Sequence, residues 1–152
     1  MKRSNLRAGF SMLTSIFLIV IMATVGIFVM SLSGKIIKTT TAQFQDAQAQ
    51  LYAKSYTEFA ILAVTGHSRA TNCINIITGT VGDINNGGYA ISTNIAYIGI
   101  DAEVGNCTQV LSNTVSTSST PLTIIIDVYV KYKDLDNANQ TLTAHRRTVQ
   151  KI

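Results

Sequence analysis

The chain has 152 residues, which is room for one small globular domain with attachments and too few for a multidomain enzyme. Charged residues make up only 13% and the mean hydropathy is +0.27, so part of the chain is unusually apolar for a soluble protein. Three of the four net positive charges come from Lys2, Arg3 and Arg7. The rest of the chain has nine basic and eight acidic residues. The basic balance is therefore weak support for a nucleic-acid partner.

The apolar part follows a short basic leader, residues 1–9. No Asp, Glu, Lys, Arg or His interrupts residues 10–32, and charge resumes at Lys35. At ~1.5 Å per residue a helix of this length crosses the ~30 Å hydrocarbon core, so we expect a membrane-spanning helix over 10–34. A cleavable secretory signal is the alternative, but its apolar region is usually ~7–15 residues long and ends in a small-x-small site.

Residues 35–65 are predicted to continue this helix as an amphipathic extension. The segment has no proline and no glycine and is rich in helix-forming residues, and Gly66 offers a stop. Its apolar side chains recur largely at three- and four-residue spacings, which indicates one stripe packed on the rest of the chain. The predicted stripe consists of Phe44, Ala47, Leu51, Tyr52, Phe59, Leu62 and Ala63.

Residues 66–152 are predicted to form a small β-rich domain. Apolar or β-branched residues alternate over 89–99 and over 122–134, and 73–78 is short and β-branched. Turn residues after 134 let 141–152 return as the antiparallel partner of 122–134. The segments "DINNGG" and "STSSTP" are predicted loops. The fold class is therefore α+β, a long N-terminal helix packed on a small antiparallel sheet.

The two cysteines, Cys73 and Cys107, both follow the apolar segment. An even pair separated by 34 positions suits a disulfide in an oxidising compartment. The chain-entropy model, which is disputed, gives such a bond about 3–4 kcal/mol of stability. Two buried free thiols are the alternative.

The junction "LRAGFSMLTS" carries a resemblance to a known family. A basic leader, glycine, phenylalanine, an uncharged helical run, an amphipathic extension and a small β-rich domain with a disulfide resemble a type IV pilin or type II secretion pseudopilin precursor. The resemblance covers residues 2–65 in detail and 66–152 only in architecture. It implies a pilin-like fold in the bacterial inner membrane, with the N-terminus cytoplasmic and the domain periplasmic or within a filament.

The resemblance also implies site residues and partners. Prepilin peptidase would cut after Gly9, and Phe10 would become the N-methylated first residue of the mature chain. The partners would be other pilin or pseudopilin subunits, the peptidase, an inner-membrane assembly platform and the lipid bilayer.

The fifth mature residue departs from the family pattern, because Thr14 stands where the family usually has glutamate. A threonine hydroxyl cannot neutralise the ammonium of a neighbouring subunit during assembly. Three interpretations stay open: a minor subunit that starts or tips the filament, a lineage that assembles without the acid, and an accidental match.

Catalysis and metal binding have little support in the sequence. His67 and His145 show no zinc or nucleophile spacing, so we expect neither an enzyme nor a cofactor nor a metal site. "DLDNANQ", residues 134–140, begins like a calcium loop but lacks its third ligand and its glycine, which favours a plain turn.

The cluster "HRR", residues 145–147, could contact DNA phosphate, but only His145 and Arg147 would share a strand face, and pairing with Asp127 is the simpler expectation. We therefore expect a structural function: a minor pilin or pseudopilin subunit of a filament machine for type II protein secretion or DNA uptake. The alternative is a single-pass membrane-anchored periplasmic binding domain that does not assemble.

Overall fold

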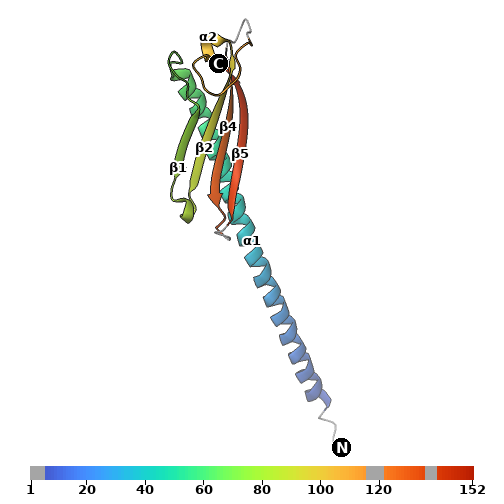
Figure 1. Cartoon of the computed structure of the whole chain (residues 1–152). Coiled ribbons are helices and arrows are strands. Elements are labelled where there is room, and N and C mark those ends of the chain that lie inside the picture. Colours follow the sequence, from blue (N-terminus) through green and yellow to red (C-terminus); the bar gives the residue numbers. More distant parts are fainter. Residues whose placement is uncertain (1–5, 116–121, 136–139) are drawn as a thin grey trace, which may run out of the picture. The chain divides into compact units, whose positions relative to one another are not determined.

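The computed structural model describes residues 6–115, 122–135 and 140–152, with side chains from Met12 onward (Figure 1). The chain divides into two units, residues 1–41 and 42–152. The first contains the apolar part of helix α1 (Leu6–Gly66), and the second contains the remainder of α1 and the sheet. The fold is α+β, as the sequence predicts.

Helix α1 has 61 residues and ends at Gly66, where the sequence places its stop. Among the described residues it begins at Leu6 rather than at Phe10, because Leu6, Arg7 and Ala8 favour helix and the single Gly9 is not enough to interrupt it. Serine and threonine hydroxyls along it donate to carbonyls one turn earlier, for example from Thr24 to Ile21 and from Ser33 to Val29. These bonds satisfy hydroxyl groups that would otherwise be exposed in an apolar surrounding.

The sheet has five strands, four of them in the order β1-β2-β4-β5 with antiparallel neighbours. The two longest predicted strands are confirmed, as is the antiparallel return of the C-terminal segment. Strand β1 covers the later part of the predicted 73–78 segment and runs beyond it. The bounds are β1 (Ile76–Val81), β2 (Tyr89–Gly99), β3 (Val110–Ser112), β4 (Leu122–Lys133) and β5 (Thr141–Lys151).

Strict alternation gives the sheet one buried face. Along β2 and β4 the side chains that point toward α1 are buried, and those between them are mostly half-buried. This face is bulky, with Tyr97, Ile95, Ile124 and Ile126 fully buried. The remaining buried members of β2 and β4 are Tyr89, Ile91, Thr93, Leu122, Val128, Val130 and Tyr132.

Helix α1 meets this face with small residues, which corrects the predicted stripe. Ala49, Ala53, Thr57, Ala60 and Val64 are buried against the sheet. Of the residues in the predicted stripe, only Tyr52 and Ala63 are half-buried, and the others are exposed. The reason is volume, since a sheet face already filled by tyrosine, isoleucine and valine leaves room on the helix mainly for small side chains such as alanine, threonine and valine.

A group of tyrosines joins α1 to the sheet where the contact between them begins. The ring of Tyr89 lies 5.0 Å from that of Tyr52 and 5.5 Å from that of Tyr132, measured between centroids. The Tyr89 hydroxyl donates to Gln48 Oε1 at 3.1 Å, and buried Gln45 donates to the Lys133 carbonyl at 3.2 Å. Burial raises the pKa of Tyr89 and of Tyr132, so both hydroxyls remain donors at neutral pH.

Two short elements were not predicted from the sequence. Helix α2 (Asp101–Val104) buries Val104, and β3 pairs in parallel with β2 through only two residues. Their apolar runs are too short to give a periodic signal. The loop predicted at "DINNGG" contains a short 3-10 turn, Ile84–Asn86, whereas "STSSTP" lies outside the described residues.

Tyr56 of α1 packs directly over Gly79 of β1, and this contact yields a prediction. A Cβ added at Gly79 would overlap the hydroxyl and ring of Tyr56. We expect Gly79→Val to lower the free energy of unfolding by about 1–3 kcal/mol, because the tyrosine must leave its place. Denaturant unfolding of the full chain in detergent micelles measures the effect.

Thr80→Val, at an exposed position of the same strand, is the matched control and should leave stability unchanged within about 0.5 kcal/mol. If the Gly79→Val and Thr80→Val proteins were equally stable, the close packing of Tyr56 on Gly79 would make no measurable contribution to the stability of the domain.

Candidate functional site

The first unit of the chain presents apolar side chains on all sides. From residue 12 to residue 32 every large apolar side chain is between 43% and 80% exposed. This segment makes α1 the one helix, among the described residues, that is long and apolar enough to cross a membrane. Such a surface needs an apolar surrounding, which a bilayer supplies.

The residues of the predicted processing junction are only partly described. Residues 1–5 of the leader lie outside the described part of the chain, and the backbone at Gly9 and Phe10 is helical. Thr14 lies on the exposed surface of α1. The first turn of the helix contains no acidic residue.

A second apolar surface lies on α1 within the domain. We call it the outer helix face: Phe44, Leu51, Phe59 and Leu62, which are 62%, 62%, 52% and 69% exposed. At about 100° per residue, Leu51 is turned roughly 160° away from buried Ala53, so this face looks away from the sheet. Exposed apolar side chains gathered on one helix face are typical of a surface that binds another protein or a membrane.

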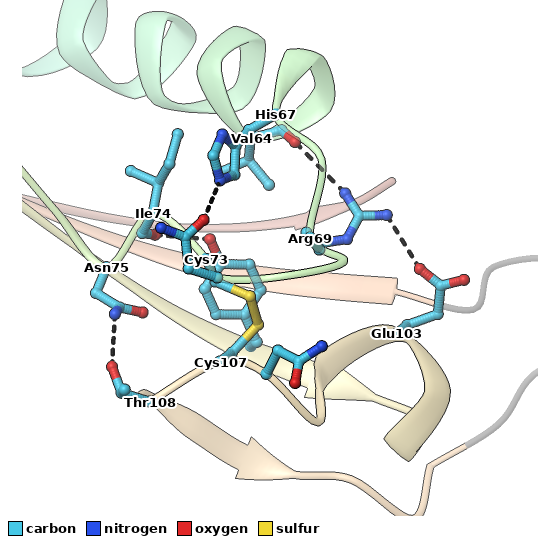
Figure 2. Close-up of a disulfide and its surroundings, with 12 residues drawn as sticks. Val64, His67, Arg69, Cys73, Ile74, Asn75, Glu103, Cys107 and Thr108 are labelled. Carbon is cyan, nitrogen blue, oxygen red and sulfur yellow. Dashed lines mark hydrogen bonds and ion pairs between the residues drawn. A yellow bond between two sulfur atoms is a disulfide. The ribbon is translucent and has the colours of Figure 1, made fainter.

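The predicted disulfide Cys73–Cys107 is confirmed, with 4.9 Å between the two Cα atoms. It joins the chain just before β1 to the chain just before β3, as Figure 2 shows. Beside it, the Ile95 amide donates to the Asn75 carbonyl and the Tyr97 amide to the Gln109 carbonyl, both at 2.8 Å. The disulfide therefore holds together the segments that precede β1 and β3, both of which accept backbone hydrogen bonds from the same side of β2.

An open hollow of about 370 Å³ lies near the end of α1 and is lined by Thr65, His67, Ser68, Arg69, Ala70, Ala102 and Glu103. The Arg69 guanidinium binds Glu103 at 3.1 Å and the Val64 carbonyl at 3.4 Å, and His67 contacts Asn72 (Figure 2). A cation at the C-terminal carbonyls of a helix is a stabilising arrangement. These contacts fasten the end of α1 to α2, and Arg69 was not singled out from the sequence because one arginine in a polar loop gives no pattern.

The basic cluster of β5 is arranged as the sequence predicts. His145 and Arg147 share the outward face of the sheet and both bind Asp127 of β4, each with a closest distance of 2.8 Å. The Tyr129 ring stacks on His145 with centroids 4.5 Å apart. Hydrogen bonds from Arg147 and then from His145 lower the pKa of Asp127, so this carboxylate stays ionised and offsets part of the positive charge.

Among the described residues no three His, Cys, Asp or Glu side chains come together in a group that could hold a metal ion. The calcium-like segment is only partly covered, because Asp136 and the three residues after it lie outside the described part of the chain.

Comparison with family models, with curated proteins and with solved structures gives no match to this chain.

Proposed function

We propose that this chain is a pilin-like subunit, a minor pilin or pseudopilin, of an inner-membrane filament machine that serves type II protein secretion or DNA uptake. Prepilin peptidase would remove residues 1–9, and Phe10 would become the methylated N-terminus. Support comes from the basic leader before Gly9, from a helix long and apolar enough to cross a membrane and from a domain built on that same helix. The disulfide is compatible with a periplasmic domain, since such bonds persist in oxidising compartments.

The observation that carries the proposal is the outer helix face. A helix that served only to anchor a domain would need apolar residues in the bilayer and none on the exposed side of the domain. Here Phe44, Leu51 and Leu62 are more than 60% exposed on the side away from the sheet. Lateral packing against helices of neighbouring subunits would bury this face as well as part of the membrane segment.

One observation favours a second function, a membrane-anchored periplasmic binding domain that does not assemble. Thr14 leaves the start of α1 without the carboxylate that would attract a neighbour's N-terminus. The two functions differ in whether the leader is removed and in whether the outer helix face is covered.

The first prediction concerns the leader. We expect the mature protein to begin at Phe10, because the basic leader and small Gly9 directly precede the apolar segment. Intact-mass measurement or N-terminal sequencing of protein isolated from membranes tests this. A mature protein that still contains Lys2 and Arg3 would refute processing and favour the anchored binding domain.

The second prediction concerns the outer helix face. We expect Leu51→Arg to reduce co-purification with sheared filaments or with the assembled machine by at least about tenfold, because an unpaired charge would be buried between helices. Gln50→Arg, at the adjacent exposed position, adds the same charge and should assemble normally. Both proteins must show the same unfolding midpoint. Equal incorporation of both variants would exclude this face from the assembly contact.

The third prediction concerns the position of the subunit, for which we propose the filament tip. A carboxylate within the apolar helix costs at least ~2.5 kcal/mol when it has no cationic neighbour, and a tip subunit has no neighbour above it. Thr14→Glu should therefore bring no gain in incorporation at matched expression. A clear increase would place the subunit inside the filament, where a neighbour's ammonium could meet the new carboxylate.

A further inference from the structure

Strand β5 forms a free edge of the sheet. It pairs with β4 through eleven residues in continuous register, and the described residues contain no strand on its other side. The Ile152 amide donates to the Leu122 carbonyl, and the Gln140 carbonyl accepts from the Asp134 amide. Even-numbered residues therefore point their backbone groups toward β4, and by alternation residues 141, 143, 145, 147, 149 and 151 point theirs outward.

This edge is long, regular and accessible. The side chains of His145, Arg147 and Val149 are 43%, 63% and 60% exposed. Thr141–Lys151 contains neither proline nor glycine, so nothing within it interrupts a row of outward amides and carbonyls. Such a row is a template for one more strand.

The positive charge of the β5 edge determines which kind of added strand it can bind. The segment Thr141–Lys151 has Arg146, Arg147, Lys151 and His145 but no acidic residue. Asp127 binds Arg147 and His145, and the structure shows no ion pair for Arg146 or Lys151 among the described residues. Lys131, exposed on the neighbouring strand, adds a further cation.

We propose that the outer edge of β5 binds an extended, acidic segment of another protein by strand addition. The outward amides and carbonyls supply the main-chain hydrogen bonds, and Arg146 and Lys151 attract carboxylates on the two faces of the added strand. The contacts of Asp127 with Arg147 and His145 keep these two side chains in place on one face of β5.

A second copy of this chain does not fit the edge. Full antiparallel overlap of two β5 strands would place Arg146 opposite Arg146, and like charges directly opposite each other are destabilising. Within the described residues the chain also has no strand with two acidic residues to offer. The occupant is therefore a different protein.

This surface is separate from the outer helix face, because it lies on the last strand of the sheet and not on α1. Binding at β5 and assembly through α1 can be tested independently, and either can fail without the other.

The experiment uses the full chain in detergent micelles and a fluorescent glutamate–valine peptide that repeats the unit Glu-Glu-Val-Val, which places carboxylates on both faces of an extended strand. The same peptide with every backbone amide N-methylated has the same charge but lacks amide donors for pairing, and a duplex DNA oligonucleotide provides a second anionic probe. Anisotropy gives the affinity for each probe. Residue-resolved hydrogen exchange shows which amides the glutamate–valine peptide protects.

The decisive variant is Thr143→Pro. It removes an outward amide and blocks pairing but breaks no hydrogen bond to β4, and Thr143→Ala is its matched control. We expect Thr143→Pro to weaken binding of the glutamate–valine peptide by about tenfold and Thr143→Ala to leave it unchanged. If Thr143→Pro disturbs folding, Val149→Pro repeats the test at the other end of β5. Arg146→Glu removes a cation from the edge and should also weaken binding of the glutamate–valine peptide about tenfold.

Strand addition predicts new protection at amides 143, 145, 147 and 149, with no change at the even-numbered amides between them. The proposal is overturned if no odd-numbered amide gains protection, or if the proline variants bind the peptide as the native chain does. Equal affinity for the N-methylated peptide would show attraction by charge alone and would overturn strand addition. Arg146-dependent binding of DNA without peptide binding would show that the edge is a nucleic-acid surface.

Discussion

The close packing of small residues of α1 against a bulky sheet face determines how the rest of the domain is arranged. Ala49, Ala53 and Ala60 are fully buried, and the sheet opposite them supplies tyrosine, isoleucine and valine side chains. Because the alanines fill this contact, the helix must direct its large apolar residues elsewhere. The contact that stabilises the domain thus creates the outer helix face, which our proposed function uses for assembly.

Two groups of contacts keep this packing in place at different points of the domain. The tyrosines around Tyr89 join the start of the helix–sheet contact to β2 and β4 through ring contacts and hydrogen bonds. Near the end of α1, Arg69 joins the helix to α2, and Cys73–Cys107 joins the segments that lead into β1 and β3. The disulfide compensates for the short pairing of β3, which contributes only two paired residues and would otherwise be weakly held.

The domain therefore presents two surfaces of different chemistry. The outer helix face is apolar, whereas the edge strand β5 is cationic and exposes backbone groups. Asp127 is central to the second surface, because its ionised carboxylate binds Arg147 and His145, whereas Arg146 and Lys151 have no ion pair among the described residues. A subunit held by its helix could in this way keep an edge of its sheet available to a further protein.

The sequence by itself determined the elements with long periodic patterns and the apolar chemistry of the first half of α1. An uncharged run marks a helix long and apolar enough to cross a membrane, and strict alternation over 89–99 and 122–134 marks strands, because these signals depend only on local geometry. The disulfide and the pairing of Asp127 with the β5 cations followed from residue type and strand register. Tertiary structure alone decided which stripe of α1 is buried, since spacing shows that a helix has an apolar face but not how much volume the sheet leaves for it. It also decided the parallel pairing of β3 and the free edge of β5, because both depend on contacts between residues far apart in the chain.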